Sequence, residues 1–210
     1  MKSKEKLKIA LAGMDEINTI WVSKMVLPDN EKQLRVEMMN EFERLLKQLK
    51  PMEKPKDKSQ LLLLMGIYGV MYKEIYMEIF DKYFKRYIYE VSHKRNISDF
   101  SRVWIANHSQ AFAVYSHDSS PQTIARTEVN SMCGIAQLDG YYQAGYTKKK
   151  WNTMGDSKVR TSHKRASGQI KFLEEPFILG DSLMMFPLDT SLGASAKEIV
   201  NCRCTMSPVK

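Results

Sequence analysis

The sequence predicts an α+β protein, in which a mostly helical N-terminal region precedes a small α+β C-terminal domain with short antiparallel strands. Long segments before residue 93 carry apolar residues at helical spacing. After Gly145, short apolar runs alternate with turn residues and the helical periodicity is lost. We therefore divide the chain into a helical region, residues 1–119, and a mixed domain, residues 120–210.

The helical region is expected to hold three or four helices. The clearest one carries its apolar side chains on a single stripe, with charges on the other face. That stripe consists of Leu34, Met38, Phe42, Leu45, Leu46 and Leu49. The tyrosines of the next helix also recur at helical spacing, so we expect them in a core or an interface. Helices are predicted over residues 15–25, 31–50, 59–92 and 98–115.

The mixed domain is expected to open with a long helix. Ser120 is a good N-cap, Pro121 suits the first helical position, and Gly145 follows the expected end at Ala144. The elements after it should be short. They are strands over residues 149–154, 182–186 and 201–206, a helix over 157–166 capped by Asp156 and ended by Gly168, a hairpin around 174–176 and a helical turn over 194–199.

Composition excludes several classes of protein. Hydrophobic residues make up 43% of the 210 residues and charged residues 27%, which is typical of a globular chain. Three cysteines do not form a disulfide framework and suit a reducing compartment. The charged start, Met1–Lys6, is not expected to be a secretory signal. The most apolar run, residues 61–71, is shorter than the roughly 20 residues of a membrane span, so we expect no membrane association.

The net charge of +8 is spread along the chain. Residues 1–120 carry 20 basic and 16 acidic groups, and the remainder carries 12 and 8, so each part has a net charge of +4. Basic residues do gather on both sides of Trp151, and the ones we select as possible DNA contacts are Lys148, Lys149, Lys150, Lys164 and Arg165. They would bind phosphates without sequence preference. The alternative is a solvated basic face.

Spaced motifs in the mixed domain carry a resemblance to a known family. They are Ile124-Ala125-Arg126-Thr127-Glu128, Trp151, Asp156-x-x-x-Arg160-x-x-His163-x-x-x-x-Gly168, Phe186-Pro187-x-Asp189 and Asn201-Cys202-Arg203-Cys204. In this order they resemble the phage head morphogenesis family, the minor head proteins similar to the F protein of phage Mu. The resemblance covers roughly residues 120–207.

The resemblance implies a structural role in the virion. Members are low-copy head proteins associated with the portal, so we expect the portal and inner capsid components as partners, and packaged or ejected DNA as a non-specific one. The expected location is the phage head, with the host cytoplasm during assembly. We expect no enzymatic activity, no cofactor and no small-molecule substrate. We also expect none of the toxin or enzyme domains that some members carry after this segment.

The same motifs raise the question of a metal. Many members of the family have Cys-x-x-Cys where this chain has Arg160-x-x-His163, and together with Cys202 and Cys204 four thiolates would suit zinc. Arg160 is always charged and cannot be a ligand, so the set is one ligand short. We therefore predict no metal. The motif is expected to be structural and comprises Arg126, Glu128, Trp151, Asp156, Arg160, His163, Gly168, Asn201, Cys202 and Cys204.

One alternative function remains open. A nuclease or toxin-like enzyme would need a general base and a cation that binds phosphate, and His163 and Arg160 have these residue types. The spacing alone does not place them in one pocket. In the structural interpretation, Asp156, Arg160 and His163 instead fasten a short helix to the closing segment, Asn201–Cys204.

Overall fold

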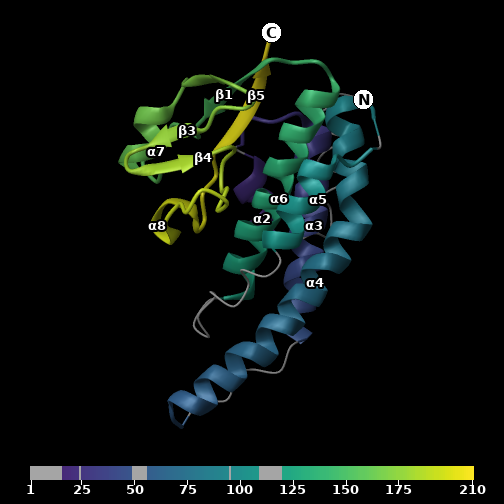
Figure 1. Ribbon diagram of the computed structural model, residues 1–210, viewed down its shortest axis with the longest axis vertical. Coiled ribbons are helices and arrows are strands. Elements are labelled where there is room, and N and C mark those ends of the chain that lie inside the picture. The colour runs from purple at the N-terminus through teal and green to yellow at the C-terminus, as the bar shows by residue number, and fades with distance from the viewer. Residues whose placement is uncertain (1–15, 24, 49–55, 95, 109–119) are drawn as a thin grey trace.

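The computed structural model describes residues 16–23, 25–48, 56–94, 96–108 and 120–210. The fold is α+β, as predicted, with helices first and short antiparallel strands after them (Figure 1). The elements are α2 (Glu16–Ser23), α3 (Asp29–Gln48), α4 (Lys58–Ser92), α5 (Asp99–His108), α6 (Pro121–Gln143), β1 (Lys148–Asn152), α7 (Thr161–Ala166), β2 (Ile170–Phe172), β3 (Phe177–Leu179), β4 (Ser182–Met184), α8 (Ala196–Ile199) and β5 (Thr205–Val209). Among these residues, no helix is long and apolar enough to cross a bilayer.

The helix ends follow local sequence signals. The side chain of Ser120 accepts a hydrogen bond from Thr123 N, which confirms the predicted N-cap of α6. Helix α6 ends at Gln143, and Gly145 adopts φ 78°, a left-handed conformation that favours glycine just past a helix. The predicted helix over residues 98–115 is confirmed as far as His108, and its last part lies outside the described residues.

Helix α6 is the centre of the core. Helices α3 and α4 pack against it, and every residue from Thr127 to Tyr141 is buried (Figure 1). Two glycines allow close approach on different sides. A Cβ on Gly140 would lie 2.7 Å from Val91 Cγ1 of α4, and a Cβ on Gly134 would lie 2.5 Å from the ring of Phe186. The buried residues of both predicted regions form one cluster, so the division at 119/120 separates two kinds of structure but not two cores.

A buried arginine links the three long helices. Arg35 of α3 donates from Nε to Tyr87 Oη of α4 at 2.9 Å, and from its two terminal nitrogens to the side-chain oxygens of Asn130 and Gln137 on α6. Burial opposes the charge, but Tyr87 and the carboxylate of Glu31 outweigh it and raise the pKa of Arg35. Tyr87 and Gln137 both donate to Glu31, at 2.7 and 2.9 Å. The guanidinium is therefore bonded to two helices besides its own, and Glu31 completes the network.

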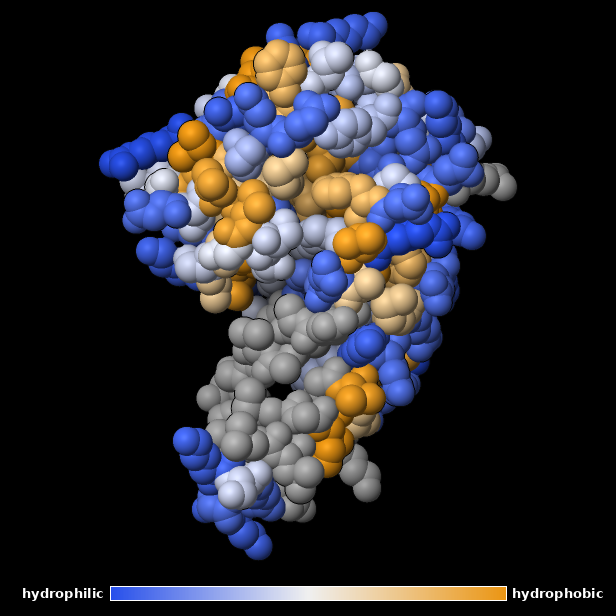
Figure 2. All heavy atoms as spheres, in the orientation of Figure 1, coloured by the Kyte–Doolittle hydropathy of each residue, from blue (hydrophilic) through white to orange (hydrophobic). Residues whose placement is uncertain are grey.

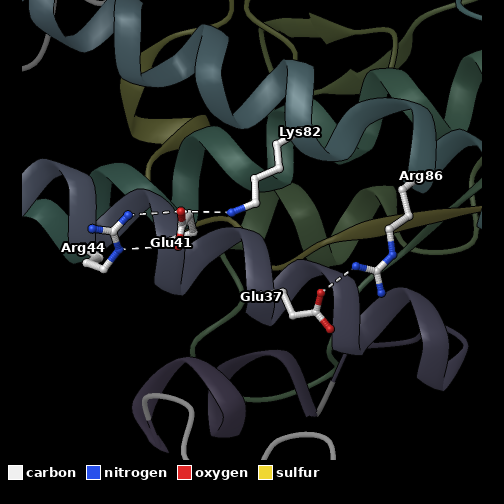
Figure 3. Close-up of polar contacts among 5 residues, drawn as sticks. All are labelled: Glu37, Glu41, Arg44, Lys82 and Arg86. Atoms are coloured by element: carbon white, nitrogen blue, oxygen red, sulfur yellow. Dashed lines mark hydrogen bonds and ion pairs between the residues drawn. The ribbon is translucent and has the colours of Figure 1, made fainter.

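The rim of the α3–α4 interface holds ion pairs that face solvent. Arg86 of α4 reaches Glu37 of α3 at 2.9 Å, and Lys82 reaches Glu41 at 3.1 Å (Figure 3). Arg44 binds the same carboxylate from within α3 (Figure 3). The cation of each pair is about half exposed, so each contact contributes little to the stability of the fold.

The strands form two small sheets. β1 lies between β2 and β5 and is antiparallel to both, while β3 and β4 form a separate hairpin in which Ile178 faces Leu183. The predicted hairpin around residues 174–176 is therefore wrong, because the strands on either side of it pair with other partners. The hairpin turn is Gly180-Asp181, with Gly180 at φ 60°, a two-residue signal that is visible in the sequence.

Two boundaries near the motif residues differ from the prediction by four residues each. Helix α7 begins at Thr161 rather than at residue 157, and its first turn has no side-chain cap. Asp156 does not cap it, because its carboxylate is bound to Arg203. The last strand begins at Thr205 rather than at residue 201, because Asn201 has φ 57°, which an extended strand does not allow.

Lys149 is not available to DNA, contrary to the prediction. It lies on the same face of β1 as Trp151, because side chains two apart in a strand share a face, and both are fully buried. Its ammonium donates to the carbonyl of Leu173 at 2.8 Å and lies over the Phe177 ring. Burial lowers the pKa of Lys149 to about 8, although Asp189 and two glutamates act in the opposite direction.

Replacing Arg35 by Ala should destabilise the protein by about 3–5 kcal/mol, because Glu31 would be left buried without its cation. The measurement is the free energy of unfolding in urea, followed by circular dichroism. The matched control is Arg86→Ala, which removes an exposed ion pair and should cost at most about 1 kcal/mol. Equal losses in the two variants would show that the buried network does not hold the helices together.

The burial of Lys149 should appear in the pH dependence of stability. Between about pH 8 and the unfolded pKa of about 10.4, the unfolded chain binds more protons at this residue than the folded one. The free energy of unfolding should therefore gain on the order of 2–3 kcal/mol from Lys149 as pH rises through this window. Lys149→Met should lose this increment in urea titrations, while Lys150→Met, on the exposed face, should keep it. Parallel curves for wild type and Lys149→Met would contradict the assignment.

Candidate functional site

A buried cluster brings together three side chains with metal-binding or nucleophilic chemistry. His163 comes from α7, and Cys202 and Cys204 come from the segment before β5. His163 Nδ1 lies 3.3 Å from Cys204 Sγ and 3.5 Å from Cys202 Sγ, and one ligand atom from each residue lies within 4.8 Å of the others. All three residues are buried, and the cysteines are free thiols.

The other ring nitrogen of His163 is held by a carboxylate. His163 Nε2 lies 3.0 Å from Glu198 Oε2, and the hydroxyl of Ser162 donates to the same oxygen at 2.7 Å. Glu198 belongs to α8, 35 residues further along the chain than His163. Glu198 was not among the site residues selected from the sequence, because no local pattern pairs it with a histidine 35 residues earlier.

Aromatic rings form one wall of the cluster. Trp151 of β1 meets His163 edge to face at 5.6 Å between ring centroids and meets Phe177 of β3 at 5.2 Å. Trp151 is fully buried, and its indole N–H has no hydrogen-bond acceptor among the residues that the structure describes. Gly168, at φ 81°, turns the chain after α7 and donates from its N–H to the carbonyl of Trp151 at 2.9 Å.

Two arginines fasten the segments around the cluster. Arg160, just before α7, donates to the carbonyl of Val200. Arg203, between the two cysteines, forms a bidentate pair with Asp156, at 2.8 Å for both hydrogen bonds. This pair lowers the pKa of Asp156, and the carboxylate is committed to Arg203 rather than to His163. Asp156 therefore does not join the histidine–cysteine cluster.

The two thiols of the cluster differ in acidity. Burial opposes ionisation of Cys202, but hydrogen bonds from Cys204 and His163 outweigh it and lower the pKa of Cys202 to about 5. The hydrogen bond with Cys202, and then burial, raise the pKa of Cys204. The cluster thus favours one thiolate, which is the form of cysteine that binds metals and acts as a nucleophile.

A small hollow opens beside the cluster. It has a volume of about 20 Å³, and its lining includes His163, Cys204, Arg160 and Arg203. A space of this size holds one water molecule. An organic substrate does not fit in this volume. The hollow can hold a water molecule or a small ion next to His163 and Cys204.

The remaining motif residues lie elsewhere. Glu128 of α6 meets His108 Nε2 at 2.6 Å, and the other nitrogen of that ring lies 3.0 Å from the hydroxyl of Thr190. Arg126 donates to Asn18 of α2 at 2.9 Å. Arg126 and Glu128 therefore reach different neighbours, and neither contributes to the histidine–cysteine cluster.

Lys149 is buried, but three of the other basic residues selected as possible DNA contacts are exposed. They are Lys150, Lys164 and Arg165. Lys148 is half-buried, with its ammonium 5.2 Å from the centre of the Phe172 ring. Contact between these side chains and DNA stays a prediction.

Comparison with known proteins identifies the family. The model of the family described as Phage Mu protein F like protein matches residues 69–207, which is more than half of the chain. A curated relative from Bacillus subtilis (strain 168), "Uncharacterized protein YqbB", is 40% identical over 93 residues, which is 42% of this chain and 30% of that protein. The chain therefore spans less than a third of that relative's length in the match. No solved structure matches the chain.

The family match begins within α4, well before residue 120, where the sequence motifs placed the start of the resemblance. Its first part therefore includes residues 69–92 of α4, the helix that packs on α6. The motifs that indicated a head morphogenesis protein are confirmed by this match: the chain belongs to the Phage Mu protein F-like family and is related to phage head proteins.

Proposed function

We propose that the protein is a minor head protein that acts in head morphogenesis and associates with the portal and inner capsid components. The observation that carries this proposal is the family match over residues 69–207, which spans the central helices and the mixed domain. Its place is then the phage head, after a period in the host cytoplasm during assembly. The match covers 30% of the curated relative, and the role of the rest of that relative is a separate question for experiment.

The surface that would meet a partner is not the apolar stripe of α3, because Leu34, Met38, Phe42 and Leu46 are buried inside this chain. Apolar side chains are instead exposed on the β3–β4 hairpin, where the paired residues Ile178 and Leu183 are 50% and 43% exposed. Figure 2 shows apolar side chains gathered over this part of the molecule, with hydrophilic ones around them. We take the hairpin as the contact surface.

We propose a structural rather than an enzymatic role. The alternative, a nuclease with His163 as general base, requires the imidazole to come within about 3 Å of a substrate proton. His163 is only 1% exposed, and both of its ring nitrogens already face other side chains. The adjoining hollow is too small for a nucleotide. These observations favour the structural role.

Association with heads can be tested by coexpressing the chain with the portal and major head proteins of its own phage and sedimenting the particles. The protein should appear at low copy in portal-containing particles and be depleted from particles assembled without portal. Ile178→Ser with Leu183→Ser should lower the bound fraction several-fold, because both side chains are exposed on the hairpin. Val70→Ser, an exposed apolar residue of α4, is the matched control. A chain that remains unbound while portal sediments would refute the proposal.

Non-specific DNA contact can be tested on α7. Lys164→Glu with Arg165→Glu should weaken binding to duplex DNA. The slope of log binding constant against log salt concentration should become less steep by about 2, because each lost phosphate contact contributes about 0.9. Lys73→Glu, an exposed lysine of α4, serves as control. Fluorescence anisotropy across a salt series gives both slopes. Identical slopes for the α7 variant and wild type would exclude this surface.

A further inference from the structure

We propose that His163, Cys202 and Cys204 bind a zinc ion whose fourth position is taken by a water molecule in the adjoining hollow. The sequence-based prediction of no metal rested on a missing fourth ligand, and the structure offers a place for one. The inference is independent of the role proposed in the phage head, because it concerns how the mixed domain is held together.

The distances match the requirements of zinc. In a tetrahedral site with zinc–sulfur bonds of about 2.3 Å and zinc–nitrogen bonds of about 2.0–2.1 Å, a ligating nitrogen and sulfur lie about 3.6 Å apart. His163 Nδ1 lies 3.3 Å from Cys204 Sγ and 3.5 Å from Cys202 Sγ. Both nitrogen–sulfur distances are therefore within a few tenths of an ångström of the tetrahedral value, and the two sulfurs lie within 4.8 Å of each other.

The imidazole is already oriented as a metal ligand. With Glu198 as the acceptor for Nε2–H, a neutral His163 directs the lone pair of Nδ1 toward the sulfurs, whereas in the metal-free cluster Nδ1 instead hydrogen-bonds Cys202. A carboxylate on the far nitrogen is the usual partner of a zinc-bound histidine, because it fixes the tautomer and makes the ring a stronger donor. Ser162 in turn fixes Glu198.

The charges of the three ligands favour binding of a divalent ion. Two thiolates and a neutral imidazole around Zn²⁺ have no net charge, so the buried site avoids the cost of an isolated ion. Mixed sulfur and nitrogen ligands select zinc over magnesium or calcium, which prefer oxygen. A disulfide between Cys202 and Cys204 is disfavoured, because one intervening residue makes a strained ring.

The hollow explains how a three-ligand set is completed. Its lining includes His163 and Cys204, and its volume of about 20 Å³ accommodates one water. Asp156 is not the fourth ligand, because Arg203 holds both of its oxygens. Three protein ligands and one water is the coordination of zinc sites that keep an open position, and here the hollow has room only for that water.

The test begins with the full chain, purified without a histidine tag and under reducing conditions. Elemental analysis should find one zinc per chain. Cys202→Ser and Cys204→Ser should each lower zinc retention more than tenfold after dialysis, whereas Cys133→Ala should retain it, because Cys133 is buried in α6 away from the cluster. Cobalt substitution should give the absorption bands of a tetrahedral thiolate complex in wild type and in Cys133→Ala only.

A second measurement uses wild type alone, in case a cysteine variant does not fold. After removal of metal with a chelator, added zinc should raise the melting temperature and protect Cys202 and Cys204 from alkylation, as mapped by peptide mass spectrometry. Folded wild type that takes up no zinc at micromolar concentrations would overturn the proposal. So would zinc that is retained when both cluster cysteines are replaced, because the ion would then be bound elsewhere.

Discussion

The buried guanidinium of Arg35 is the interaction on which the rest of the structure depends. It is bonded to α4 through Tyr87 and to α6 through Asn130 and Gln137, so it fixes the three long helices relative to one another. A buried cation is tolerated only when its donors are satisfied and an anion is close. Glu31 meets that need through the same tyrosine and glutamine. The network therefore specifies one arrangement of helices that apolar packing alone would leave less defined.

Helix α6 transmits this arrangement to the mixed domain. Thr127 accepts from the N–H of Asn201, Ser131 donates to the carbonyl of Leu188, and Tyr141 donates to the carbonyl of Met206. These three contacts run along one helix and hold the segments on both sides of Cys202 and Cys204. The histidine–cysteine cluster is thus placed by a helix that itself contributes no residue to it. The family match likewise includes part of α4 and all of α6.

The small sheets and short helices of the mixed domain share one core with the long helices, and polar links add to their organisation. Arg203 binds Asp156, Arg160 binds the carbonyl of Val200, and Glu198 binds His163. Each link joins segments that are 35 or more residues apart in sequence.

The sequence by itself determined the fold class, the positions of the long helices, the Ser120 cap and the family, because these depend on periodicity and on motifs that are local in the chain. It also contained the signal for the Gly180-Asp181 turn, and the burial of Lys149 follows once Trp151 is placed in the core. Only the tertiary structure decided which residues meet at the site. Glu198 reaches His163, and Asp156 turns away to Arg203, because the turn at Asn201 and the packing on α6 set the direction of each segment. The distance between two side chains far apart in sequence depends on every element between them, and no local pattern encodes it.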